Sequence, residues 1–260
     1  MIPLPREHGA YGQLAFPLAT ALLAFGASPG ALLVVTAAVA GFFAHEPASI
    51  LAGLRGGRAL RERRSEAVRW LAWWGAVSAA AAAAAVVAMP VAARLWLLLP
   101  VAPAILLAYA AVRGREKSWY GEVAAACAFS SIAVPTALAS GATPQEASTV
   151  AVPLAVLFVT STLAVRIVIL RVRGGGDPVG AAATRRAALA VVGGGAAAVA
   201  FGVGAGLLLP AALVASTPGL VGSSLLAFRP PAPAQLRAVG WTLVALSLGT
   251  SIILVATLRS

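Results

Sequence analysis

The stretch GFFAHEPASILAGLRGGRALRERRSEAVR, from Gly41 to Arg69, decides how this chain folds. It starts in an apolar segment, holds His45 and Glu46 among apolar residues, and ends in a run of six arginines. A charged side chain at the centre of a bilayer costs about 2.5–3.5 kcal/mol on insertion scales, so such side chains face a cavity or a partner. The stretch therefore predicts a membrane-spanning helix that carries a polar site and ends at a basic surface.

The composition of the whole chain indicates a membrane protein. Of its 260 residues, 60% are hydrophobic and 10% are charged, and the mean hydropathy is +0.93. So little polar surface cannot cover a soluble globule of this size. The N-terminus runs into a long apolar segment without a cleavage site, so no cleavable signal is expected. Cys127 is the single cysteine, which excludes disulfides within one chain.

Apolar segments of about 20 residues mark membrane spans. The chain contains nine such segments, which predict an all-α, polytopic bundle in a single transmembrane domain covering residues 1–260. The predicted spans are 11–27, 31–53, 69–89, 94–112, 121–140, 147–170, 187–204, 206–226 and 237–257. The stretch GVGAGLLLP after Phe201 leaves one alternative open, because it forms either a hairpin between spans seven and eight or a break in one long helix.

The distribution of basic residues favours nine spans over eight. With nine spans and the N-terminus inside, sixteen of the nineteen basic residues lie on one side of the membrane. They are Arg6, Arg55, Arg58, Arg61, Arg63, Arg64, Arg69, Arg113, Arg115, Lys117, Arg171, Arg173, Arg185, Arg186, Arg229 and Arg237. The positive-inside rule makes this side cytoplasmic. Attraction to anionic lipid accounts for such loops, and no nucleic-acid partner is expected, because no binding motif accompanies the charge.

The ionisable residues in and beside the spans predict a polar site in the cytoplasmic half of the membrane. His45 and Glu46 are the candidate catalytic residues, for proton transfer, metal contact or orientation. The candidates for binding an anionic substrate are Arg166, Arg55, Arg58, Arg171, Arg6, His8 and Glu122. The structural alternative is that Glu46 forms an interhelical ion pair with Arg166 or His45, because buried ions need partners whatever the function.

The sequence contains no motif that identifies a metal or a cofactor. No Walker loop, dinucleotide fingerprint or zinc-hydrolase motif is present, and no metal ligands are predicted. The two histidines, His8 and His45, leave a bis-histidine haem or metal pair open, although the usual supporting ligands are missing.

Three segments carry a resemblance to known families: PREHGAYGQLAFPLATAL near the N-terminus, AHEP at Ala44–Pro47, and the RGGR loop. Together they resemble the YwiC-like family of bacterial integral membrane proteins, which implies a bacterial inner membrane. More remotely, the nine spans, the enlarged loops after spans two and six and the first helix are similar to the UbiA superfamily of intramembrane prenyltransferases. That resemblance implies two four-helix halves plus a ninth helix around a central cavity, with a lateral opening for a prenyl tail.

The chain departs from the UbiA pattern at the residues that would hold magnesium. UbiA-type enzymes carry aspartate-rich motifs at the inner ends of spans two and six, which hold magnesium against the substrate diphosphate. Here Glu46 is the only acid left in the membrane part of the first corresponding stretch. Arg166, Arg171 and Arg173 replace the acids of the second, with Asp177 alone beyond them. Magnesium use is left open, and arginines can neutralise a phosphate without a metal.

Three functions remain compatible with the sequence. The first is a UbiA-like intramembrane enzyme that binds an isoprenoid or other anionic lipid in a cytoplasm-facing cavity, such as a prenyltransferase with degenerate aspartate motifs. The second is a transporter or carrier for a small or lipid anion, with two halves rocking about the same cavity. The third is a haem- or lipid-binding assembly protein. The sequence does not predict an oligomeric state.

Overall fold

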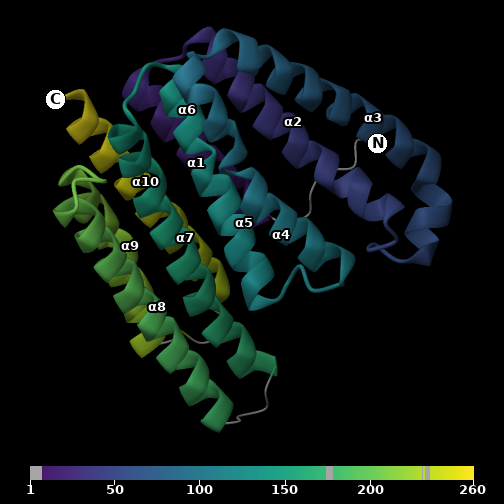
Figure 1. Ribbon diagram of the computed structural model, residues 1–260. Coiled ribbons are helices and arrows are strands. Elements are labelled where there is room, and N and C mark those ends of the chain that lie inside the picture. The colour runs from purple at the N-terminus through teal and green to yellow at the C-terminus, as the bar shows by residue number, and fades with distance from the viewer. Residues whose placement is uncertain (1–7, 174–177, 230, 232–234) are drawn as a thin grey trace.

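The computed structural model describes residues 8–173, 178–229, 231 and 235–260. All regular elements in these ranges are helices (Figure 1). They are α1 (His8–Phe25), α2 (Pro29–Leu51), α3 (Gly57–Ala88), the 3-10 helix η1 (Val91–Leu98), α4 (Val101–Val112), α5 (Trp119–Ser131), α6 (Ala133–Ala139), α7 (Pro144–Arg173), α8 (Pro178–Gly204), α9 (Ala211–Phe228) and α10 (Leu236–Arg259). The predicted all-α fold is confirmed.

Most of these helices have the length and composition of membrane spans. Eight helical segments of the described chain are long and apolar enough to cross a membrane, and two of them each combine two elements, η1 with α4 and α5 with α6. The apolar part of α1, Gly9–Phe25, is somewhat shorter. These nine segments correspond to the nine predicted spans, and the protein is a multi-pass membrane protein.

The prediction of a long basic loop between the second and third spans was wrong. Residues 54–69 were expected to connect the spans, whereas α3 begins at Gly57 and continues for 32 residues, about 48 Å at 1.5 Å per residue. The segment RALRERRSEA consists mainly of strong helix formers, and Arg58 pairs with Glu62 one turn later at 2.8 Å. The true connection is only 52–56, where Gly53 and Gly56 take positive φ angles of 75° and 91°.

The fourth and fifth passes are interrupted helices. The 3-10 helix η1 ends at Leu98, and α4 starts only after Pro100. In the fifth pass, α5 ends at Ser131 and α6 starts at Ala133. Pro135 accounts for this second break, because it has no N–H to donate to the carbonyl of Ser131 and its ring crowds that carbonyl.

Spans seven and eight are separate helices. The chain leaves α8 after Gly204 and turns before α9 begins at Ala211. The amides of Leu207 and Leu208 both donate to the carbonyl of Gly202, at 2.8 and 3.0 Å, and close this turn. α8 and α9 then pack against each other. The alternative of one long, broken helix over residues 187–226 is therefore wrong.

Hydrogen bonds join the connections at one end of the bundle. Ser28 Oγ donates to the carbonyl of Ala139 at 2.7 Å, and Ser140 Oγ donates to the carbonyl of Gly26 at 2.7 Å. The α1–α2 and α6–α7 connections therefore meet. At the opposite end, which we call the basic end, arginines from the α2–α3 connection and from α7 both reach the α4–α5 connection, residues 113–118.

Small residues let α7 and α9 pack closely against each other. Gly219 of α9 lies so close to α7 that a Cβ atom there would be 2.7 Å from Leu157 Cδ1. Thr160 and Ser223 join the same two helices through a buried hydroxyl–hydroxyl hydrogen bond of 2.9 Å. Close contact between small residues, with polar side chains bonded across it, is typical of helix pairs in membranes. On the other side of the molecule, α4 packs on α5 and η1, and α2 packs on α3.

Candidate functional site

A pocket of about 730 Å³ occupies the space between α2 and α4, and α1 and α5 complete its wall. Its deeper part is apolar and is lined by residues such as Ala38, Phe42, Ala104, Ala108, Phe129 and Ile132. Pro100 and Ile132, at the breaks in the fourth and fifth passes, belong to this wall. The volume falls within the range of about 300–1,000 Å³ that is usual for small-molecule sites.

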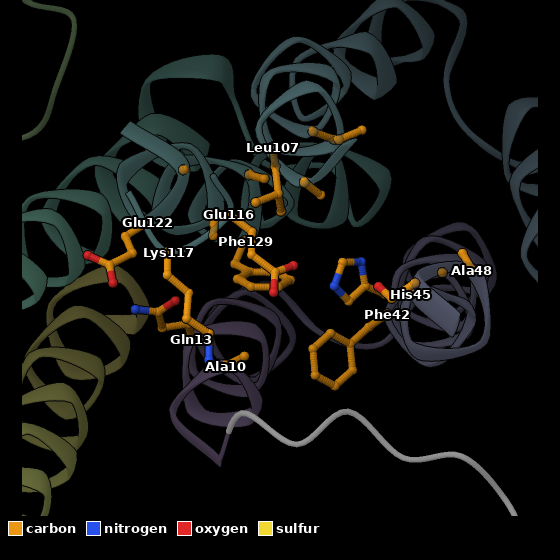
Figure 2. A pocket seen from close by; sticks show the side chains of 18 of the residues that line it. Ala10, Gln13, Phe42, His45, Ala48, Leu107, Glu116, Lys117, Glu122 and Phe129 are labelled. Carbon is orange, nitrogen blue, oxygen red and sulfur yellow. The ribbon is translucent and has the colours of Figure 1, made fainter. Parts of the chain in front are cut away.

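The polar part of the pocket lies towards the basic end. Its polar and charged lining side chains come from four helices and two connections (Figure 2). They are Gln13, His45, Ser49, Arg55, Glu116, Lys117, Glu122 and Thr162. A single cavity thus joins an apolar interior to a polar mouth that carries charges of both signs.

Arg55 and Glu46 form a buried ion pair behind this mouth. Arg55 Nη2 lies 2.6 Å from Glu46 Oε2, and Arg55 Nε donates to the same oxygen at 3.1 Å. The Glu46 side chain is 1% exposed and does not line the pocket, whereas Arg55 does. The sequence-based alternative paired Glu46 with Arg166 or His45, but the turn at 52–56 folds Arg55 back onto α2, and Arg55 takes that place.

Arg55 also reaches the α4–α5 connection. Its Nη1 lies 3.4 Å from Glu116 Oε1, so one guanidinium joins two carboxylates from different parts of the chain. The Glu116 carboxylate and the His45 ring face each other across the pocket (Figure 2). Sequence reasoning singled out His45 and missed Glu116. The only signal was an acid within the otherwise basic segment Arg113–Lys117.

Arg166 fixes the other side of the same connection. Its Nη1 donates to Glu122 Oε2 at 3.1 Å and to the backbone carbonyl of Lys117 at 3.1 Å. Glu122 lines the pocket, but Arg166 does not. Arg166 and Glu122 were each predicted as binding residues, and the structure pairs them with each other. Only Glu122 lines the pocket, whereas Arg166 lies behind the pocket wall.

The α4–α5 connection is shaped so that its charged residues stand at the mouth. Ser118 caps α5, since its Oγ accepts from the amide of Gly121 at 3.3 Å. Gly121 packs directly against the backbone carbonyl of Glu116, and a Cβ atom at position 121 would overlap that oxygen. The absence of a side chain at 121 allows the connection to fold tightly onto the start of α5, where Glu116 and Lys117 reach the pocket.

Several predicted binding residues are not brought to this pocket. Arg58 is 85% exposed and pairs with Glu62 on the surface of α3. Arg6 lies outside the described residues, and so do the side chains of His8 and Arg171. A bis-histidine site consequently remains a prediction. Among the residues that the structure describes, no three His, Cys, Asp or Glu side chains gather closely enough to hold a metal ion.

Most of the pocket lies in the part of the chain that matches a known protein family. The model of the family described as YwiC-like protein matches residues 4–137, just over half of the 260-residue chain. Every lining residue of the pocket except Thr162 falls within this range. No curated protein matches the chain, and no solved structure matches it. The match over α1 to α6 shows that the chain belongs to the YwiC-like family.

Proposed function

We propose that this protein is an intramembrane enzyme that holds an isoprenoid or similar amphiphilic lipid in the pocket and acts on its head group. The observation that carries the proposal is the joining of an apolar cavity to a polar mouth in a single space of about 730 Å³. A soluble metabolite would not need the apolar depth, and a plain structural lipid would not need the ionisable mouth.

The hydrocarbon tail of the lipid enters the apolar part of the pocket, and its head group meets the polar part. Ala104, Ala108 and Phe129 supply a wall without hydrogen-bonding side chains, which suits a hydrocarbon tail. At the mouth, His45, Glu116 and Lys117 present groups that can donate or accept protons (Figure 2). This division also resembles the arrangement expected of a UbiA-like enzyme, which places the reacting head group beside the inner end of the second helix.

His45 is the proposed general acid or base, and Glu116 assists it. The two side chains face each other across the pocket, so a head group between them can exchange a proton with either (Figure 2). Glu46 has a different role, because it lies behind Arg55 and does not line the pocket. We assign it as the positioning residue of Arg55, which in turn holds Glu116.

The proposed reaction takes place on the cytoplasmic side of a bacterial inner membrane. The support is the distribution of charge: Arg55, Arg113, Arg115 and Lys117 all lie in the two connections that border the mouth. Short connections rich in Lys and Arg stay in the cytoplasm. On this assignment the N-terminus is also cytoplasmic, since α1 begins beside the pocket mouth at Gly9 and Ala10.

Native mass spectrometry of the gently purified protein tests whether a lipid occupies the pocket. Ala108→Trp fills the apolar cavity, and Ala83→Trp, at an exposed site on α3 outside the pocket, is the matched control. We expect Ala108→Trp to lose most of the co-purified lipid, while Ala83→Trp retains it at the wild-type occupancy. Equal occupancy in both variants would overturn the proposed site.

Turnover separates an enzyme from a binding protein. Wild-type protein incubated with membrane lipid extract is expected to convert the lipid that it retains, as followed by liquid chromatography and mass spectrometry. His45→Ala should retain that lipid but convert it at least about 100-fold more slowly, because general acid–base catalysis contributes about 10²–10⁴-fold. If the His45→Ala protein converts the lipid at the wild-type rate, His45 is not the acid or base.

A further inference from the structure

We infer that the amphiphile in this pocket has an uncharged head group with a hydroxyl, as a lipid alcohol does, and that Ser49 and Gln13 recognise it by hydrogen bonds. The inference rests on the proposed function, since it specifies the ligand of the same pocket. It comes from the polar side chains that line the pocket without bonding to the protein.

Ser49 is a buried serine whose hydroxyl faces the pocket. It is 3% exposed, lines the pocket and lies one turn after His45 on α2. Its hydroxyl makes no hydrogen bond with any residue that the structure describes. It is not sealed inside the protein, as the indole nitrogens of Trp70 and Trp74 are, so its accessible side is the pocket. Buried polar groups almost always have a partner, and an exception of this kind points to a ligand.

Other buried hydroxyls in the helices bond to their own backbone. Thr20, Ser130 and Ser216 each donate to the carbonyl four residues earlier, at 2.7–2.8 Å. Such bonds are a common arrangement for serine and threonine inside a helix. The corresponding acceptor for Ser49 is the carbonyl of His45, and among the described contacts the Ser49 hydroxyl does not bond to it. The hydroxyl therefore remains available to a ligand.

Gln13 of α1 and Thr162 of α7 are uncharged groups of the same kind. Both line the pocket, and neither side chain bonds to another residue within the described chain. Figure 2 shows Gln13 on the same side of the pocket as Lys117. An amide and a hydroxyl can each donate and accept hydrogen bonds. They suit an uncharged oxygen that also does both.

The charged side chains of the lining do not select an anion. Within the described chain they are two cations, Arg55 and Lys117, and two carboxylates, Glu116 and Glu122, so no excess positive charge faces the ligand. The carboxylates repel a negative head group, and a carboxylate oxygen only accepts hydrogen bonds. A hydroxyl can donate to such an oxygen and also accept from a donor, whereas an ionised carboxylate or diphosphate can only accept.

A set of probes with one tail and different head groups tests the inference. The probes are four C15 isoprenoids that carry an alcohol, its methyl ether, a carboxylate or a diphosphate. The full-length protein is incubated in detergent with an equimolar mixture, with and without magnesium, and repurified, and the retained probes are quantified by liquid chromatography and mass spectrometry. We expect at least about fivefold more alcohol than methyl ether, because the ether cannot donate a hydrogen bond. The two anions should be retained no better than the ether.

Variants of two buried serines locate the effect. Ser49→Ala should lower retention of the alcohol about fivefold and leave the thermal unfolding temperature unchanged, because the hydroxyl has no hydrogen bond within the described protein to lose. Ser130→Ala is the matched control, since Ser130 is equally buried but bonds to its own helix and does not line the pocket. It should leave retention unchanged, whereas Gln13→Leu should act like Ser49→Ala. Equal retention by Ser49→Ala and Ser130→Ala would overturn the role of Ser49.

The outcomes separate this inference from the proposed function. Preferential retention of the carboxylate or the diphosphate would overturn the uncharged head group while supporting a lipid site. Equal retention of the alcohol and its methyl ether would show that the hydroxyl is not recognised, and would also overturn the inference. If no probe is retained, or if Ala108→Trp retains all four like the wild type, the lipid pocket itself is wrong and the inference fails with it.

Discussion

The Arg55 guanidinium closes on the buried Glu46 carboxylate at 2.6 Å and holds Glu116 with its other edge at 3.4 Å. This relationship places one side chain between the second helix and the α4–α5 connection. It also explains how a glutamate with 1% exposure is tolerated within an apolar helix.

Arg55→Met is expected to destabilise the protein by about 3 kcal/mol or more, because it leaves the buried Glu46 without its arginine. Arg58→Met is the matched control, since Arg58 is 85% exposed and its pair with Glu62 is worth at most about 0.5 kcal/mol. The measurement is denaturant unfolding in mixed micelles. The double variant Glu46→Met/Arg55→Met should recover much of the loss. If Arg55→Met and Arg58→Met unfold alike, the ion pair does not stabilise the fold.

Gly121→Ala is expected to lower lipid occupancy and stability together. The added Cβ would overlap the carbonyl of Glu116 and push the α4–α5 connection away from α5, and Glu116 and Lys117 would move with it. Overpacking of this kind costs about 1–3 kcal/mol. Gly75→Ala on α3 is the control, because open space surrounds that position and alanine there should be neutral or slightly stabilising. Thermal unfolding and native mass spectrometry measure the two effects. Unchanged occupancy in Gly121→Ala would mean that the connection does not shape the pocket.

The fold was largely predictable because the bilayer restricts what an apolar segment can do. Backbone groups in lipid must bond within their own segment, so each long apolar stretch becomes a helix. The exceptions are α3, which begins at Gly57 rather than at 69, and α8, which begins at Pro178 rather than at 187, so both include residues that the sequence places in loops. In α3 the charged residues suggest a connection, but Arg58, Glu62 and their neighbours are good helix formers that extend the span beyond its apolar part.

The site was only partly predictable, because pairing depends on how short connections fold. The sequence indicated that Glu46 needs a partner and suggested Arg166 or His45, because it does not show how the turn at 52–56 folds. The turn directs Arg55 inward and leaves Arg58 on the surface. Glu116 was missed for the same reason: nothing in a loop sequence shows that an acid will stand opposite His45.

The hydrogen bond between Thr160 and Ser223 is expected to couple α7 and α9 modestly. A double-mutant cycle with Thr160→Val and Ser223→Ala should give a coupling free energy of about 0.6 kcal/mol and no more than about 1.7 kcal/mol, the range known for such bonds in membranes. The two hydroxyls are 2.9 Å apart and buried. Unfolding in mixed micelles measures each variant. A coupling indistinguishable from zero would mean that packing around Gly219 and Leu157, rather than this bond, holds the two helices together.

The orientation of the bundle can be determined with single cysteines. Cys127 is the only native cysteine, so Cys127→Ala provides a background without thiols. In that background, Arg115→Cys places a thiol at the basic end and Ala27→Cys places one in the exposed α1–α2 connection at the other end. Because short basic connections stay inside, a membrane-impermeant maleimide should label Cys at 115 only in inverted vesicles and Cys at 27 only in intact spheroplasts. Labelling in the reverse sense would place the pocket mouth on the outer side and contradict a cytoplasmic reaction. Labelling of both positions from the same side would contradict the fold itself, because a single pass of α1 or α2 separates position 27 from the basic end.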